Sequence, residues 1–360
     1  MRKKQLISAI FFVLLGLLAH SAEGKTKDKE KSGDLKSEIK AYIRHHLEDT
    51  HDFSIGSYTT EEGKKKYIGF SLPVILWDGE LVSFSSSKLK HGKSVYRVGS
   101  KHYKLYHGKI YRTDAEGTIT YDADKKVTND KPLDLSMTKS VVTMLFTAAL
   151  MFFLFRNLAK SYKTNGSIAA GVGRFFEPIV IYIRDDIAIP NIGKRHYTRY
   201  MSYLLTIFFF VWFLNILGLS PLGINVTGNI AVTFGLALLT FLITNLTANK
   251  NYWAHIFWMP GVPVLMKILL APIELLGVFI KPFSLLIRLY ANIQAGHIVL
   301  MSLIGLMFIF NNWLGSSLSF LLAFVISIIE VLVALLQAYI FTMLSALYFG
   351  FAVEEHEETH

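Results

Sequence analysis

The chain has 360 residues, of which 52% are hydrophobic, and a formal net charge of +10. Charge is scarce after Tyr200, because between Met201 and Gly350 the formal charges are limited to Lys250, Lys267, Glu274, Lys281, Arg288 and Glu330. This contrast indicates an integral membrane part after a polar N-terminal part, so the net charge is no sign of nucleic-acid binding. The chain contains no cysteine, which excludes disulfides and thiolate metal sites.

The first 22 residues have the pattern of a secretory signal peptide. Arg2, Lys3 and Lys4 precede an apolar run over residues 6–18, and small residues follow at Ser21 and Ala22. A retained transmembrane helix is the alternative, but the run is short for one and a polar segment follows at once. Cleavage would place the mature N-terminus across the membrane from the cytoplasm.

Residues 23–37 are charged and poor in hydrophobic side chains, which is typical of a disordered linker. Residues 39–47 suit a short helix, and the runs that follow are rich in Tyr, Val, Ile and Phe. The dipeptides Asp78-Gly79 and His107-Gly108 stand between strand-like runs and indicate hairpin turns. Residues 38–135 are therefore predicted to form a small β-rich extracytoplasmic domain.

Histidines are frequent in this domain and raise the question of a metal site: His45, His46, His51, His91, His102 and His107. Only the first two are adjacent, and no spacing among the six matches a zinc ligand set. We expect solvated surface histidines, with no metal and no other cofactor. The sequence of the domain does not indicate what it does.

The uncharged apolar run at residues 140–155 is the first transmembrane helix expected after the signal. The loop after it is strongly basic, which predicts a cytoplasmic position and agrees with the signal peptide. Apolar residues recur within that loop at intervals of three and four and predict an amphipathic helix at the membrane surface: Phe175, Phe176, Ile179, Val180, Ile183 and Ile187. A helix in a soluble loop is the alternative.

Two further membrane helices are expected at residues 203–219 and 228–246, with a cytoplasmic connection over residues 247–258. The next apolar segment, residues 264–310, is unusually long. At about 1.5 Å per residue, a helix of that length is about twice as long as the roughly 30 Å bilayer core. It must be broken, steeply tilted or laid along the membrane. A turn at residues 311–317 then leads to a last apolar helix over residues 318–350.

These elements predict an all-α polytopic membrane protein preceded by the β-rich extramembrane domain. About five helices are transmembrane or membrane-embedded, and one further helix is amphipathic and interfacial. The last two long helices are joined by a short turn, so they must pack as a tilted antiparallel hairpin.

Arg288 is the most unusual residue of the long apolar segment. An arginine at the centre of a membrane helix costs about 2.5–3.5 kcal/mol on insertion scales, so it normally faces protein, water or a counter-charge and marks an ion path. Asn292, four residues on, shares its helix face, and Gly296 continues that row. An arginine that snorkels to a lipid headgroup is the alternative.

His297 points to another side of the same helix, and Glu330 and Gln337, seven residues apart, share a face of the last helix. Counted outward from the turn, His297 and Glu330 lie at similar depths, so they can meet. A His–Glu pair within a membrane suits a proton relay. A buried structural ion pair is the alternative.

The C-terminal half resembles the a-subunit family of F-type ATP synthases, over residues 171–356. The stretch IELLGVFIKPFSLLIRLYANIQAGH is similar to that family's signature, and its essential arginine falls on Arg288. The stretch EVLVALLQAYIFTMLSALYFGFAVEEH resembles the family's last helix, and its functional glutamine falls on Gln337. FFFVWFLNILGLSPLG and GNIAVTFGLAL resemble the preceding helical hairpin. Many members carry a carboxylate at the position of His297 and a histidine at that of Glu330, so the pair is exchanged here.

The resemblance implies a stator subunit with two offset proton half-channels beside a rotating ring of c subunits. It implies that Arg288 attracts the deprotonated ring carboxylate and blocks proton leakage between the half-channels. It also implies proton-path roles for Asn292, His297, Glu330 and Gln337, and places Glu274 near the same path. The sequence has no GxxxxGK[ST] phosphate loop, so the expected role is that of a non-catalytic subunit without a nucleotide site.

The expected partners are the c ring, the b subunit of the peripheral stalk, other ATP synthase subunits and the lipid bilayer, and not nucleic acid. The expected location is the bacterial inner membrane, with the N-terminal domain periplasmic and the C-terminus cytoplasmic. Two other classes remain open on the residues alone: an envelope sensor or anchor with a ligand-binding β domain, and a self-contained secondary transporter. A transporter would commonly show internal repeats, and none is visible in the sequence.

Overall fold

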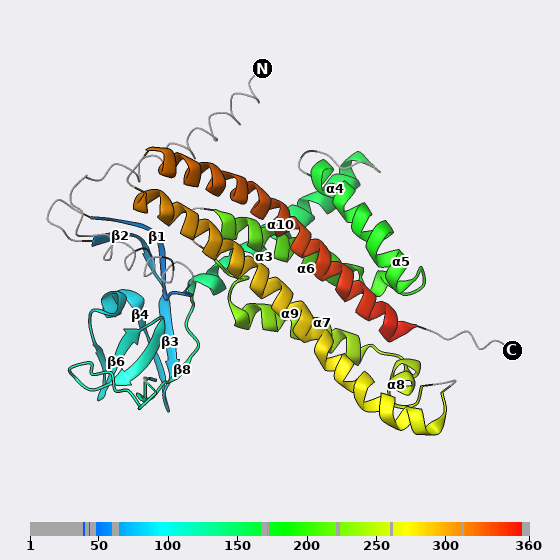
Figure 1. The fold of residues 1–360 in the computed structure, drawn as a ribbon, viewed down its shortest axis with the longest axis horizontal. Coiled ribbons are helices and arrows are strands. Elements are labelled where there is room, and N and C mark those ends of the chain that lie inside the picture. Colours follow the sequence, from blue (N-terminus) through cyan, green and yellow to red (C-terminus); the bar gives the residue numbers. More distant parts are fainter. Residues whose placement is uncertain are drawn as a thin grey trace, which may run out of the picture. The chain divides into compact units, whose positions relative to one another are not determined.

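The computed structural model describes Ile39, Ile43 and residues 48–59, 65–124, 126–166, 171, 173–220, 224–259, 262–310 and 313–354. The predicted signal peptide, the charged linker and most of the short helix at residues 39–47 fall outside these residues. Within them, an N-terminal β region precedes a helical part (Figure 1). The predicted fold class is confirmed.

The β region contains three small antiparallel sheets. The first pairs β1 (Asp52–Thr59) with β2 (Lys65–Ser71). The second has the order β4–β3–β8, and the third has the order β5–β6–β7. Their bounds are β3 (Pro73–Trp77), β4 (Leu81–Ser85), β5 (Tyr96–Val98), β6 (Lys101–Tyr106), β7 (Lys109–Thr113) and β8 (Leu133–Asp134). A 3₁₀ segment, η1 (Ser86–Gly92), follows β4.

Both predicted hairpin turns are confirmed. Trp77 pairs with Leu81 around the Asp78-Gly79 turn, where Gly79 has a φ of 76°. Tyr106 pairs with Lys109 around His107-Gly108, and both turn residues have positive φ. Two successive positive φ values fit a two-residue hairpin loop that matches the twist of the strands.

Buried and exposed side chains alternate along β3 and β4, and the buried ones form part of the core of the β region. One face of each strand is buried and the other is exposed, as expected where one side of an antiparallel sheet packs inward. The buried core consists of Val74, Leu76, Val82, Phe84, Leu89, Tyr103 and Ile110.

The helical part follows the predicted apolar segments. The helices are α3 (Lys139–Asn165), α4 (Gly173–Tyr182), α5 (Ile189–Ile192), α6 (Tyr197–Leu219), α7 (Ile230–Leu246), α8 (Lys250–Phe257), α9 (Val264–Ile309) and α10 (Trp313–Val353). A π-helical segment, η2 (Ile183–Ala188), connects α4 to α5. The first membrane helix extends about ten residues beyond its predicted end, because its basic C-terminal turns continue the helix.

Within the described part of the chain, three helices are long and apolar enough to cross a membrane: α3, α6 and α10. The bent pair of α7 and α8, with an angle of 99° between its parts, makes a possible fourth. The remaining long segment, α9, carries four charged residues along its 46-residue length.

The long apolar segment forms one continuous helix, although Pro272 and Pro282 lie inside it. Continuity removes the broken-helix alternative and leaves a tilted helix or one that lies along the membrane. α9 and α10 run side by side as the predicted hairpin (Figure 1). α10 also packs closely on α6, so α6 and α9 both contact the last helix.

The predicted amphipathic segment is confirmed as α4, η2 and α5. Ile183 and Ile187 are fully buried, whereas Arg184 and Asp185 are exposed and form an ion pair at 2.7 Å. Phe175 differs from the prediction, because 62% of its surface is exposed. The next residue, Phe176, packs on Phe209 and Phe213 of α6, so Phe175 points to another side of α4.

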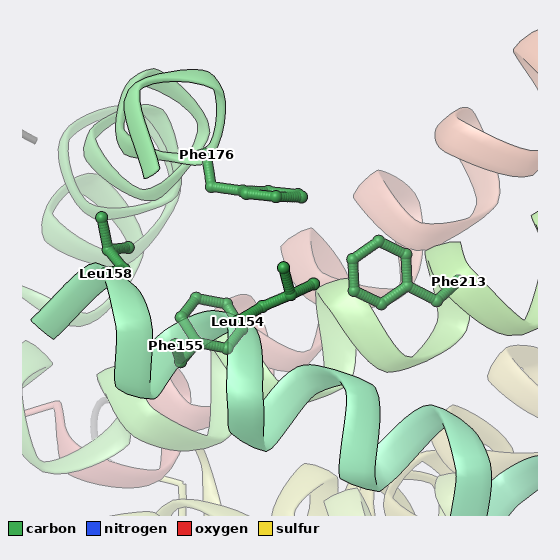
Figure 2. A pocket seen from close by; sticks show the side chains of 5 residues that line it. All are labelled: Leu154, Phe155, Leu158, Phe176 and Phe213. Atoms are coloured by element: carbon green, nitrogen blue, oxygen red, sulfur yellow. The ribbon is translucent and has the colours of Figure 1, made fainter. Parts of the chain in front are cut away.

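Aromatic side chains join α4 to α3 and α6. Figure 2 shows Phe155 of α3, Phe176 of α4 and Phe213 of α6 around a small apolar pocket, with Leu154 and Leu158 completing its lining. The ring centroids of Phe176 and Phe213 are 6.1 Å apart and nearly perpendicular, a favourable edge-to-face geometry. With no polar group in its lining, this pocket serves packing and is no candidate site.

Candidate proton-path site

Arg288 lies half-buried near the middle of α9. It forms no ion pair with a carboxylate among the described residues, although nearby positions of the helix are apolar. Asn292, one turn further on, is exposed. The Arg288–Asn292 face is therefore exposed at Asn292 and partly covered at Arg288, whose guanidinium interacts electrostatically with Tyr348 of α10.

His297 has the opposite environment, because only 4% of its surface is exposed. Its ring faces α6: a β-carbon placed on Gly218 would lie 3.5 Å from His297 Nε2. A glycine at residue 218 thus makes room for the imidazole between α6 and α9. The sequence prediction that His297 and Arg288 point to different sides of α9 agrees with these exposures.

Glu330 of α10 is also buried, with 9% of its surface exposed, and its carboxyl group lies against the backbone of Gly296. Neither carboxyl oxygen has a hydrogen-bond partner among the described residues. His297 is the next residue after Gly296. The two titratable groups therefore approach the same part of the interface between α9 and α10, which we name the helix seam. They do not form a direct ion pair within 4 Å, however, and the structure places them near each other rather than in contact.

Gln337 is buried two turns after Glu330, with 4% of its surface exposed. Glu274 lies half-buried fourteen residues before Arg288, about 21 Å along the helix axis. It interacts electrostatically with Lys281, whose ammonium group lies 5.7 Å from the ring of Tyr348 and 5.4 Å from that of Phe351. Glu274 is thus part of a separate cluster on α9, distant from His297 and Glu330.

A set of amides lies beside His297 that sequence reasoning did not assign to the site. Asn225 Nδ2 donates to Gln294 Oε1 at 3.1 Å, and Gln294 precedes His297 by three residues on α9. Thr227 Oγ1 donates to Asn215 Oδ1 at 2.8 Å. Asn215 in turn donates to the Ala334 carbonyl of α10 at 3.3 Å. The sequence signals for this set are the amides Asn215 and Gln294 within apolar runs, and the segment NVTGN at residues 225–229, which begins six residues after the end of α6.

The β region holds two His–carboxylate pairs. The burial of His51 corrects the prediction of solvated surface histidines for that residue, whereas His91 and His107 are exposed, as predicted. His51 is 3% exposed, and its Nε2 lies 2.7 Å from Asp134 Oδ2. His91 Nδ1 lies 3.1 Å from Asp52 Oδ2. His51 differs from the prediction because it lies directly before β1 and its buried ring is compensated by the carboxylate of Asp134 in β8.

These pairs alter the acidity of both carboxyl groups. Burial alone would raise the pKa of Asp134, but the hydrogen bonds from His51 and Ser136 outweigh it and lower that pKa to about 2. The pKa of Asp52 is also lowered, because hydrogen bonds from His91 and Ser86 outweigh its burial. No cluster of three or more His, Asp or Glu side chains suited to a metal ion occurs among the described residues.

Comparison with known proteins decides the family. The model of the ATP synthase A chain matches residues 141–350, which is more than half of the chain. The chain belongs to the ATP synthase A chain family. Residues 42–135 match a second model, a domain of unknown function (DUF8433). The family match thus covers the helical part, whereas the β region brings no assigned role with it.

Relatives named ATP synthase subunit a support the assignment. The protein from Chloroherpeton thalassium is 43% identical over 237 residues, which cover 63% of this chain and 70% of that protein. The one from Myxococcus xanthus is 40% identical over 241 residues, covering 64% and 78%. The one from Chlorobium phaeobacteroides strain DSM 266 is 43% identical over 233 residues, covering 62% and 67%. As a member of this family with several apolar helices, the chain is a membrane protein.

Proposed function

We propose that this A chain is the stator subunit of the membrane sector of an F-type ATP synthase and couples proton flow to rotation of a c-subunit ring. The observation that carries the proposal is Arg288, a half-buried arginine of an apolar helix without a carboxylate partner in the described part of its own chain. A charge in such a position needs a counter-charge. A ring carboxylate that passes along α9 supplies one.

The exposed faces of α9 support a partner on that side. Exposed apolar side chains flank the face of α9 that carries Arg288, including Ile280, Ile287 and Val299. A helix surface of this kind is suited to pack against further apolar helices. The ring is therefore proposed to roll along α9, with Arg288 at the level of its carboxylates.

In this mechanism Arg288 favours the deprotonated ring carboxylate by charge attraction in a low-dielectric setting, and it separates two half-channels. The buried side of the seam forms the outer half-channel, with His297, Glu330 and Gln337 as its polar groups and Asn292 next to Arg288. Protons cross under a driving force of about 2.3 kcal/mol per charge per 100 mV, which the ring converts to rotation. Glu274, in its cluster with Lys281, belongs to the cytoplasmic side.

The proposed topology follows the charge pattern. The segment 1–22 is a signal peptide and 23–37 a linker; the domain at residues 38–135 is periplasmic, and the membrane domain spans residues 138–356. The basic loop before α4 and the C-terminus are cytoplasmic, in the inner membrane of a bacterium. The b subunit of the peripheral stalk and the remaining ATP synthase subunits complete the complex, and ATP chemistry takes place on those other subunits.

The decisive experiment replaces Arg288 by Ala and measures ATP-driven acidification in inverted membrane vesicles. We expect pumping to be abolished, with the c subunit and the other subunits still co-purifying. Lys267→Ala is the matched control: it removes a basic residue of the same helix that lies 4.6 Å from the Trp258 ring, and it should leave pumping intact. Normal pumping by the Arg288→Ala complex would contradict the proposed function.

A further inference from the structure

The carboxyl group of Asp49 joins the β region to two membrane helices. Its Oδ1 accepts a hydrogen bond from the backbone N–H of Ser140 at 3.0 Å, and its Oδ2 accepts one from Thr138 Oγ1 at 2.9 Å. Both donors belong to the start of α3, where a carboxylate is favoured by the exposed N–H groups of the helix. Oδ2 also accepts from Asn229 Nδ2 at 3.1 Å.

Asn229 is the N-cap residue of α7, because its own side-chain oxygen accepts from Ala231 N at 3.0 Å. The same amide therefore caps α7 with its oxygen and binds Asp49 with its nitrogen. One carboxylate of the β region thus fixes the starts of α3 and α7 together.

Asn229 ends a short segment, residues 224–229, that we name the entrance loop. Gly228 N donates to Asn225 Oδ1 at 3.0 Å, which closes the loop on itself. Phe53 of β1 packs against the small apolar cluster formed by Ile224 and Val226 of the loop and Leu214 of α6. The β region therefore holds the entrance loop by the hydrogen bond to Asn229 and supports the apolar cluster to which the loop contributes.

The entrance loop in turn lies over the buried histidine. A β-carbon on Gly218 would meet the Ile224 carbonyl oxygen at 3.1 Å and His297 Nε2 at 3.5 Å, so loop and imidazole approach the same glycine. The loop also reaches α9 directly, because Asn225 binds Gln294, one turn before His297. The contacts run from Asp49 through Asn229 and Asn225 to the side of α9 that carries His297.

We propose that Asp49 is a positioning residue for proton entry: through Asn229 it holds the entrance loop against α9 above His297, and the β region thereby sets the geometry of the outer entrance. This inference rests on the proposed function, since it assigns a role at the mouth of the same half-channel. It gives residues 42–135 a function within the complex, where the matching domain model assigns none.

The experiment uses the whole complex in vesicles and exploits the reciprocal roles of the two side chains. Asp49→Ala should slow ATP synthesis driven by an imposed proton gradient about three- to tenfold and change its dependence on the pH of the outer compartment. Asn229→Asp should do the same, because it keeps the cap oxygen for α7 but replaces the donor with a second carboxylate beside Asp49. Glu116→Ala, at an exposed carboxylate of the same domain, should behave as wild type.

The double variant Asp49→Asn with Asn229→Asp is the sharpest test. Asn at residue 49 donates to Asp at residue 229, so the hydrogen bond is restored with donor and acceptor exchanged. We expect the double variant to recover most of the rate and the wild-type outer-pH profile. A merely structural role would show as lost co-purification of the c subunit, with an unchanged pH profile in the complexes that do assemble.

The two proposals fail in different ways. Wild-type rates and outer-pH profiles for Asp49→Ala and Asn229→Asp, with pumping still abolished by Arg288→Ala, would overturn the role of Asp49 alone. A double variant as slow as the single variants would also overturn it. Normal pumping by Arg288→Ala would overturn the proposed function itself, whatever the Asp49 variants do.

Discussion

Glu330 of α10 lies directly over the backbone of Gly296 of α9, so closely that a β-carbon on the glycine would collide with the carboxyl group. The glycine therefore sets where a buried carboxyl group sits within the helix seam. Gly296 and the carboxyl group of Glu330 both lie beside His297, so the position of Glu330 is relevant to proton transfer.

We predict that Gly296→Ala slows ATP-driven proton pumping at least tenfold while the complex still assembles. The added methyl group must displace Glu330 from its place against α9, and a small overlap of this kind costs about 1–3 kcal/mol. The measurement is the initial rate of vesicle acidification per assembled complex.

Gly235→Ala is the matched control for that variant. Residue 235 lies in the interior of α7 rather than on the α9 face proposed to meet the ring, and a β-carbon there would meet no atom of this chain within 4 Å among those described. Both changes raise helix propensity by about 1 kcal/mol, so propensity cancels in the comparison. Equal rates for the two variants would mean that the contact between Glu330 and Gly296 does not matter for pumping.

A second prediction concerns the acid stability of the β region. The pKa of Asp134 in the folded protein is about 2, below its ordinary value of 3.8, so its ionised form stabilises the fold. The contribution, on the order of 1–2 kcal/mol after screening by solvent, is complete above about pH 5 and is lost as the pH falls through the folded value near 2. Asp134→Asn lacks the charge and should lack this pH-dependent part of the stability.

Pepsin cleavage of the β region in the purified complex measures this, because pepsin acts in the acid range. The ratio of cleavage rates, Asp134→Asn over wild type, cancels the enzyme's own pH dependence. It should be on the order of tenfold at pH 4 and shrink towards pH 2. Glu116→Gln, at an exposed carboxylate, should give a ratio near one throughout. A constant ratio for Asp134→Asn would show that the ion pair with His51 contributes no acid-dependent stability.

The sequence predicts most of the fold, because the strongest constraints are local. Apolar runs with one charged residue at most identify α3, α6, α7 and α10, since a membrane leaves such runs few other structures. The turns at Asp78-Gly79 and His107-Gly108 determine two hairpins through the positive φ values of Gly79, His107 and Gly108. These features depend on residues that are close together in the sequence.

The parts that sequence reasoning missed depend on contacts between distant segments. Asp49 binds residues 89 to 180 positions away, and no local pattern marks it. Similarly, the burial of His51 follows from its pairing with Asp134, 83 residues on. The interface between α9 and α10 shows a further limit of prediction from sequence. Counting residues from the turn correctly places His297 and Glu330 at similar positions along the two helix axes. It does not give the rotation of each helix about its own axis, so it could not decide whether the two side chains touch.

The last prediction addresses whether His297 and Glu330 serve one path although they form no direct ion pair. Two groups that act in sequence on the same proton give non-additive effects, because removal of either already breaks the path. We therefore expect His297→Gln and Glu330→Gln each to slow pumping by at least tenfold. The double variant should be no slower than the slower single variant.

The measurement is a double-mutant cycle on the initial pumping rate, repeated over a range of outer pH. Gln is chosen at both positions because it keeps polar, hydrogen-bonding character in a buried site while removing the titratable group. Each single variant should also flatten the dependence of the rate on outer pH, since the group that exchanges protons is gone. If the two effects multiply in the double variant, the residues act independently, and Glu330 supports the helix seam without passing protons to His297.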